Sequence, residues 1–201
     1  MDLIITAVVL YFAGHTLWKY IHAIRVRLKF EKRLISVCDE QGYRVTRLRS
    51  SLKSLGRVSE SPDFIVKTRD KHYCVRYITT FRSRGYYHFA NEEYAASFIR
   101  LSYALPMAKK FDEVELGDKF HHFPPIELPS ELEGREGVEL IMLFNPVPLG
   151  ITIAQNDSQL GGIVGNGDKI GRFTIYDGRN FCDLLEGKEL LVRKKDRWSE
   201  R

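Results

Sequence analysis

Residues 62–89 (PDFIVKTRDKHYCVRYITTFRSRGYYHF) constrain the fold more than any other part of the chain. Before the short polar connector at residues 69–71, Phe64 and Val66 alternate with Ile65 and Lys67. After it, every second residue from Tyr73 to Thr79 is aromatic or β-branched, and the residues between them include Cys74 and Arg76. A period of two is typical of β-strands, because successive side chains point to opposite faces. The stretch therefore predicts a β-hairpin, and the extended run at residues 86–89 is expected to add a strand.

The composition places the chain among folded globular proteins. The chain is 44% hydrophobic and 12% aromatic, which excludes a disordered chain. Its length of 201 residues leaves room for one domain plus an appendage. The three cysteines are widely spaced, without a CxxC pair. This spacing excludes a disulfide framework and a zinc finger, and it fits a reducing compartment.

The positive charge is concentrated in the N-terminal third. Residues 1–60 hold eleven Lys and Arg against five Asp and Glu, a net charge of +6, so the remaining 141 residues sum to −1. A uniformly basic nucleic-acid-binding surface is therefore not indicated.

An uncharged apolar run from Leu3 to Trp18 predicts a membrane anchor at residues 1–20. Sixteen helical residues span about 24 Å, and the apolar flank up to Ile21 brings the usable length close to that of a bilayer core. A cleaved signal peptide would need a positive segment ahead of this run, and only Met1-Asp2 precedes it. A core helix would not be apolar on every side.

Six basic residues and one acid follow directly in residues 19–33. By the positive-inside rule, the chain is expected to cross the cell membrane once and to leave the C-terminal domain in the cytoplasm. The anchor is expected to continue as a basic juxtamembrane helix at residues 21–42, stopped by Gly42. Its basic face is open to two interpretations, contact with anionic lipid or an ordinary solvated surface.

The remaining patterns predict an α/β domain at residues 43–190, followed by a charged tail at 191–201. Asn91 is a plausible N-cap, and apolar residues at helical spacing follow it up to Pro106. The other expected elements are a strand at 43–48, an irregular segment at 111–137, a buried strand at 139–144, a short strand at 151–153, a glycine-rich loop at 160–171, a strand at 172–176 and a helix from 180 to 185. This order predicts one mixed sheet flanked by helices.

The hairpin also carries the pattern of a known nuclease motif. Pro62-Asp63 opens the first hairpin strand, and Cys74-Val75-Arg76 occupies the place of the second motif on the next strand, where alternation puts Cys74 and Arg76 on one face. With the strand, Asp-Gly turn and Leu-rich helix at 173–187, residues 30–190 resemble the restriction-endonuclease-like PD-(D/E)xK superfamily, closest to its Mrr-type branch. The resemblance implies a single mixed-sheet restriction-endonuclease-like domain behind the transmembrane helix.

In this family, carboxylates hold Mg²⁺ and a lysine polarises the water or the phosphate. The resemblance implies that Asp63 is a metal ligand, that Glu40 is an accessory acid, and that Arg76 stands at the lysine position. Cys74 replaces the second carboxylate, and a thiol is a poor ligand for Mg²⁺. Mg²⁺ is therefore expected only if the protein is active, and no other cofactor is expected.

The first hypothesis is a catalytically degenerate domain that binds a partner or nucleic acid. The alternatives are an active metal-dependent endonuclease and a membrane-tethered scaffold that does not bind nucleic acid, so its status as an enzyme stays open. In a purely structural interpretation, Asp63 caps a strand and Arg76 pairs with a surface acid. The candidate nucleic-acid-binding residues are the basic side chains of the hairpin: Lys67, Arg69, Lys71, Arg82 and Arg84.

Overall fold

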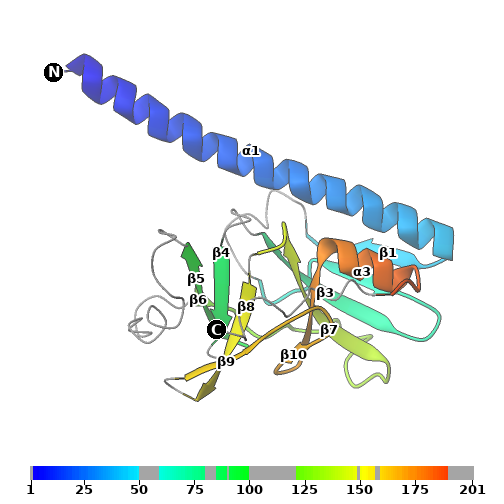
Figure 1. The fold of residues 1–201 in the computed structure, drawn as a ribbon. Helices are drawn as coiled ribbons and strands as arrows, with labels where there is room; N and C mark the ends of the chain where they lie inside the picture. Colours follow the sequence, from blue (N-terminus) through cyan, green and yellow to red (C-terminus); the bar gives the residue numbers. More distant parts are fainter. Residues whose placement is uncertain are drawn as a thin grey trace.

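The computed structural model describes residues 2–49, 59–79, 85–89, 91–99, 121–148, 150–156 and 159–189. Figure 1 shows the described elements, which surround a central sheet under one long helix. They are α1 (Asp2–Gln41), β1 (Arg44–Arg47), β2 (Phe64–Lys67), β3 (His72–Thr79), β4 (Gly85–Phe89), β5 (Tyr94–Ile99), β6 (His121–His122), β7 (Val138–Asn145), β8 (Gly150–Asn156), β9 (Gln159–Ile163), β10 (Lys169–Ile170), β11 (Phe173–Asp177) and α3 (Gly178–Leu185).

The main sheet has six strands in the order β1-β2-β3-β7-β11-β10. Strands β3, β7 and β11 run parallel to one another, and β1, β2 and β10 pair antiparallel with their neighbours. The predicted hairpin is confirmed, because Phe64 faces Val75 and Lys67 faces His72 in the β2–β3 ladder. A mixed α/β architecture is thereby established, as the order of elements predicted.

The apolar run at residues 139–144 lies where the sequence predicted a buried strand. β7 pairs with β3 on one side and with β11 on the other, and its residues Ile141 to Phe144 are fully buried. A strand that is covered on both faces needs apolar side chains at every position, so the run has no alternation. β7 is therefore the centre of the main sheet.

A second sheet corrects the expectation that one sheet contains all the strands. It has the order β6-β5-β4-β8-β9. Two neighbouring strands of the main sheet, β3 and β7, each lead into a strand of the second sheet, β4 and β8. β3 and β7 are parallel, with Thr79 opposite Asn145, and β4 and β8 are also parallel, with Tyr86 opposite Gly150. The extended run at 86–89 does add a strand, but it adds it to the second sheet.

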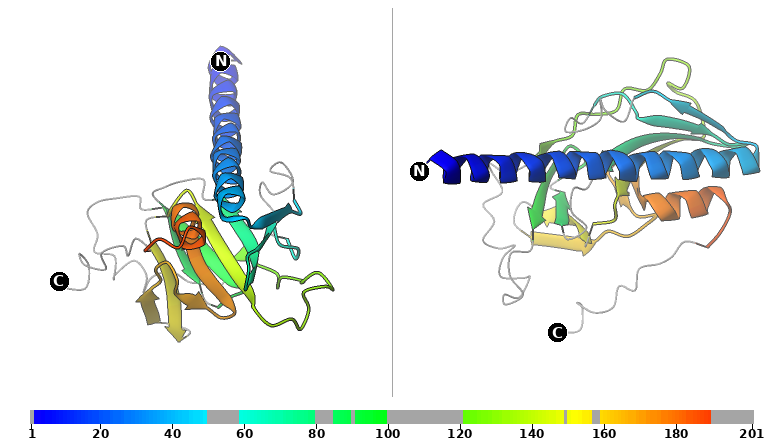
Figure 2. Two further views of the ribbon diagram at one scale, coloured as in Figure 1. Left: turned by 90° about the vertical axis from the view of Figure 1, so that its right-hand side faces the viewer. Right: turned by 90° about the horizontal axis from the view of Figure 1, so that it is seen from above.

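Two hydrophobic cores lie on the two faces of the main sheet. The first core lies under α1 and α3, and alternate strand residues such as Tyr73, Val75 and Tyr77 point into it. The second core lies between the two sheets, where Met142 and Phe144 of β7 meet Phe89 of β4. The molecule thus has three layers, as the views in Figure 2 show: the helices α1 and α3 form the first, the main sheet the second and the second sheet the third.

Helix α1 ends where the sequence predicted. Gly42 has a φ of +69°, a left-handed conformation that glycine adopts without strain. Its N–H donates to the carbonyl of Asp39, and the N–H of Tyr43 donates to that of Cys38. These two bonds form the usual glycine-terminated end of a helix.

The sequence also predicted a transmembrane anchor at residues 1–20. Among the residues that the structure describes, no helix is both long and apolar enough to cross a membrane.

Two local predictions are wrong. The segment after Asn91 was expected to be a helix, but residues 94–99 form strand β5, which pairs with β4 and β6. Backbone pairing on both sides outweighs the helical spacing of its apolar residues. The glycine-rich segment at 160–171 was expected to be a loop, but it contributes most of β9 and all of β10.

Gly137 provides a test of how the hairpin is fixed to the central strand. Its φ is +76°, and a Cβ at this position would lie 2.8 Å from the carbonyl oxygen of Asp70. Gly137→Ala is expected to lower the free energy of unfolding by about 2–4 kcal/mol, because strain and the clash add. Urea denaturation of the detergent-solubilised chain measures this loss.

Gly42→Ala is the matched control. Gly42 has a similar φ, but no atom lies within 4 Å of an added Cβ. We expect a loss of about 1–2 kcal/mol from strain alone. Equal losses in the two variants would mean that the contact with Asp70 is unimportant.

Candidate functional site

Asp63 lies at the start of the hairpin, buried beneath α1. Its carboxylate Oδ2 accepts a hydrogen bond of 2.9 Å from the backbone N–H of Tyr77, and its own N–H donates to the carbonyl of Val75. The side chain thus continues the β2–β3 ladder beyond Phe64. This is the strand-capping role that the structural interpretation of Asp63 predicted.

The other carboxylate oxygen of Asp63 binds Arg27 of α1. Arg27 Nη2 donates to Oδ1 at 3.1 Å, and Arg27 Nε donates to Glu31 Oε1 at 2.8 Å. Only 1% of the Arg27 surface is exposed. Its guanidinium also lies over the rings of Phe64 and Tyr77, 5.1 and 4.8 Å from their centroids.

A fourth charge completes what we call the Arg27 network, which consists of Arg27, Glu31, Arg47 and Asp63. Arg47 Nη1 of β1 lies 3.3 Å from Glu31 Oε2. Two positive and two negative charges therefore neutralise one another; three of them are buried, and Arg47 is partly exposed at the edge. A buried charge without partners would be very unfavourable, so the network fixes where α1 can lie on the sheet.

Tyr77 extends this polar region toward the end of the central strand. Asn145 Nδ2 donates to the Tyr77 hydroxyl oxygen at 3.0 Å. Burial raises the pKa of Tyr77, so the phenol stays neutral at physiological pH. A neutral phenol between an amide and a guanidinium has a positioning role, and nothing in these contacts activates it as a base.

The structure does not bring Glu40 to Asp63. Glu40 is exposed and accepts a hydrogen bond of 3.0 Å from Ser36 on the same helix. It lies thirteen residues beyond Arg27, which corresponds to about 20 Å along the helix axis. Within the described part of the chain, no three His, Cys, Asp or Glu side chains are grouped so that they could hold a metal ion.

Cys74 and Arg76 share one face of β3, as alternation predicts, and this face lies opposite the contact of Asp63 with Arg27, although the pKa of Arg76, which burial lowers, is still raised in part by the Asp63 charge. Asp63 binds Arg27 on the side of the helices, whereas Arg76 lies over the ring of Phe173 in the core between the sheets. Cys74 is fully buried, and burial raises the pKa of its thiol to about 11. The thiol is therefore neutral and inert at physiological pH.

Arg76 is 2% exposed and is fixed by backbone carbonyls, not by the surface acid that one interpretation expected. Its Nη2 donates to the carbonyl oxygens of Ser59 and Pro124. Its Nε and Nη1 have no hydrogen-bond partner in the described structure. Burial lowers the pKa of Arg76 to about 10, which leaves it charged at neutral pH. Arg76 thus joins the segments that lead into β2 and out of β6.

Three of the candidate nucleic-acid-binding residues lie at the exposed tip of the hairpin. Lys67, Arg69 and Lys71 all face solvent around the turn that joins β2 and β3. Lys71 Nζ lies 2.7 Å from Glu139 Oε1, and this hydrogen bond raises the pKa of Lys71. Arg82 and Arg84 lie outside the described residues.

The first half of α1 is the largest exposed apolar surface of the described structure. Figure 1 shows this half rising away from the domain toward its N-terminus. Side chains on all sides of it are exposed, and neither core includes a described residue that precedes Phe30. The exposed large apolar residues are Ile5, Val8, Val9, Leu10, Tyr11, Phe12, Leu17, Trp18, Tyr20 and Ile21.

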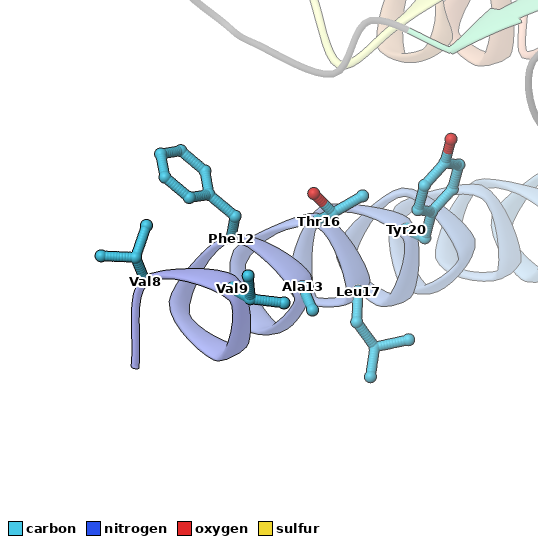
Figure 3. Close-up of a pocket in the computed structure, with 7 residues that line it drawn as sticks. All are labelled: Val8, Val9, Phe12, Ala13, Thr16, Leu17 and Tyr20. Atoms are coloured by element: carbon cyan, nitrogen blue, oxygen red, sulfur yellow. The ribbon is translucent and has the colours of Figure 1, made fainter. Parts of the chain in front are cut away.

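Figure 3 shows part of this surface, a shallow apolar hollow along one side of the helix. It is lined only by residues of α1: Val8, Val9, Phe12, Ala13, Thr16, Leu17 and Tyr20. On another side, the rings of Tyr11, His15, Trp18 and His22 stack in sequence, with centroids 5.4–6.4 Å apart. Such a surface is unfavourable in water.

The role of Arg27 escaped the sequence analysis. The spacing of Arg27 and Glu31 at i and i+4 predicts an ion pair on a helix, and the structure contains it. No local pattern connects Arg27 to Asp63, which lies 36 residues away. Only the packing of α1 on the hairpin brings them together.

The chain matches no protein-family model, no curated protein and no solved structure.

A double-mutant cycle tests the Arg27 network. Arg27→Met and Asp63→Ala are each expected to lower the free energy of unfolding by about 3–5 kcal/mol, because each leaves a buried charge short of a partner. Together they should cost at least about 2 kcal/mol less than the sum of the single effects. Urea denaturation of the full chain in detergent gives all four values.

Lys71 and Glu139 provide the matched exposed pair. Their charged atoms lie 2.7 Å apart, but both side chains are more than a third exposed. The cycle of Lys71→Met and Glu139→Ala should show a coupling below about 1 kcal/mol. A coupling of the same size in both cycles would argue against a special role of burial at Arg27.

Proposed function

We propose that this protein is a membrane-attached binding protein. Residues 3–20 of α1 enter lipid, and the α/β domain is held at the cytoplasmic face of the cell membrane, where it binds a partner. The observation that carries the proposal is the exposed apolar surface on all sides of the first half of α1. The sequence predicts that this half crosses the bilayer once, but the proposal requires only that it enters the lipid.

The energetics favour lipid as the environment of this segment. Each large apolar side chain gains roughly 1.5–3 kcal/mol when it leaves water. Nine such side chains are exposed within residues 3–20, and the most polar side chains of the same segment are His15 and Lys19. Lys19 lies at the end of the run, where a long side chain can reach the headgroups.

The proposed role of the domain rests on its resemblance to the restriction-endonuclease-like superfamily and on the placement of the motif residues. Both oxygens of Asp63 are engaged by Tyr77 and Arg27, while Arg76 lies on the other face of the sheet. Glu40 is about 20 Å from Arg27 along the helix. This arrangement supports a degenerate copy that binds and does not cut.

Nucleic acid is the partner that the hairpin favours. Lys67, Arg69 and Lys71 are exposed at its tip, and Arg82 and Arg84 add two more positive charges in the sequence. Clustered basic side chains of this kind neutralise phosphates and release counterions.

Membrane attachment is tested by flotation of the full chain with lipid vesicles. Leu10→Asp combined with Leu17→Asp should reduce the bound fraction at least tenfold, because a carboxylate in the lipid is strongly unfavourable. Leu48→Asp is the control, since Leu48 is an exposed apolar residue of the domain, 44% accessible. An unchanged bound fraction in the Leu10/Leu17 variant would refute the proposed attachment.

Loss of catalysis is tested with the full chain, DNA or RNA, and Mg²⁺ or Mn²⁺. We expect no cleavage by the natural protein. Cleavage by the natural protein would overturn the proposal in favour of an active nuclease. The Cys74→Glu, Arg76→Lys variant should stay inactive as well, because both side chains lie opposite the contact of Asp63 with Arg27. Activity in this variant would instead identify a retired nuclease site, with an oxygen ligand and a lysine in place.

Nucleic-acid binding is tested by the salt dependence of the dissociation constant. Replacing Lys67, Arg69 and Lys71 by Gln should weaken binding to double-stranded DNA and reduce the slope against salt by roughly 2–3, one for each lost phosphate contact. Lys188→Gln, an exposed position beyond α3, is the control. Unchanged binding in the triple variant would exclude the hairpin tip as the contact surface and favour a scaffold function.

A further inference from the structure

The outer side of α1 remains apolar beyond the segment proposed to enter lipid. Ile21, Leu28 and Ile35 are 39%, 40% and 50% exposed, although the last two lie in the half of the helix that packs on the domain. A spacing of seven residues keeps them on one side, because the drift is only about 20° per seven residues. The buried residues of the same half, such as Ala23, Phe30 and Leu34, lie on a different side and face the domain.

Basic side chains flank this apolar row. Arg25 and Lys32 follow Ile21 and Leu28 by four residues, so each lies on the same side one turn further along. Both are exposed, as is Lys29 between them. We call these six residues, Ile21, Arg25, Leu28, Lys29, Lys32 and Ile35, the outer face of α1.

The outer face contains no negative charge to balance its three positive charges. Glu31 is the only acid between residues 3 and 38, and it is buried against Arg27 and Arg47. Asp39 and Glu40 come only in the last turn, at the end farthest from the apolar half. Interleaved apolar and basic side chains are typical of a helix that lies on anionic lipid.

We infer that the outer face of α1 lies on an anionic lipid surface, so that α1 enters one leaflet obliquely and carries the domain on its other side. The inference rests on the proposed membrane attachment and adds the chemistry of the lipid and the orientation of the domain. Figures 1 and 2 show the domain packed along one side of α1, which leaves the outer side accessible.

The length of the helix links lipid contact to inclination. Leu28 and Ile35 lie about 12 and 22 Å beyond Tyr20 along the axis. The interfacial layer on each side of the hydrocarbon core is only about 5–8 Å thick. A helix perpendicular to the bilayer would carry both side chains past this layer, so contact requires a strongly inclined helix.

A second copy of the chain fits this face less well. Two outer faces in contact would place Arg25, Lys29 and Lys32 close to their equivalents in the other copy, and like charges repel. Anionic headgroups neutralise these charges, while the apolar row reaches the boundary of the acyl chains.

The first test compares the binding of the full chain to vesicles of phosphatidylcholine alone and of phosphatidylcholine with phosphatidylserine. Replacing Arg25, Lys29 and Lys32 together by Gln should weaken binding to the anionic vesicles about fivefold per residue, roughly a hundredfold in all. Binding to neutral vesicles should not change. The matched control replaces the three basic residues of the hairpin tip, Lys67, Arg69 and Lys71, and should change either affinity less than about twofold.

The second test measures depth with an environment-sensitive fluorophore on Leu28→Cys or Ile35→Cys. Cys38, Cys74 and Cys182 are all buried, so a thiol reagent labels the introduced residue. Both labels should be quenched by nitroxide lipids in anionic vesicles. Lys188→Cys is the control, because Lys188 is 62% exposed beyond α3 and should stay unquenched.

The outcomes separate this inference from the proposed attachment. A failure to bind any vesicle would refute the attachment itself. Vesicle binding that does not depend on anionic lipid, with unquenched labels at 28 and 35, would refute only the inference. Disulfide-linked dimers of the unlabelled Leu28→Cys variant on vesicles would show that the outer face binds a second copy of the chain. A tag at Met1 that is found inside sealed vesicles would show that α1 crosses the whole bilayer. Either result overturns the inference.

Discussion

The position of α1 on the domain depends on a buried guanidinium. Arg27 is buried beside the first core, with two carboxylates and two aromatic rings around it that come from α1, from the start of β2 and from β3. A charge in such a site is stable only with its complete set of partners. Phe30 and Leu34 of the same helix pack in the first core, and the Arg27 network favours one register of the helix on the sheet.

This register has consequences for the whole molecule. Because α1 continues from its apolar half into its packed half without a break, the domain is joined rigidly to the segment that we propose enters lipid. The contact with α1 uses one oxygen of Asp63, the residue that the nuclease resemblance would assign to a metal, and the backbone of Tyr77 on β3 uses the other. Both oxygens of Asp63 are thus engaged in contacts that hold the hairpin and the helix in place.

Patterns that depend on neighbouring residues were predicted well. The hairpin, the central strand β7, the Gly42 end of α1 and the strand before Asp177 each carry a signal within a few residues: alternation, an unbroken apolar run, a glycine, or an Asp-Gly turn. Strand β5 was mistaken for a helix because Tyr94 and Phe98 also fit helical spacing. Its pairing with β4 and β6 decided the conformation, and pairing partners are not visible in a local window.

The sequence alone determined the hairpin and the two kinds of surface on α1, since each depends only on which side chains occur and at what spacing. Tertiary structure decided three other matters: that the strands divide into two sheets, that Arg27 binds Asp63, and that Arg76 faces the opposite core. Alternation defines two faces of a strand but does not say what covers each face. Contacts between residues far apart in the chain arise only when the layers pack.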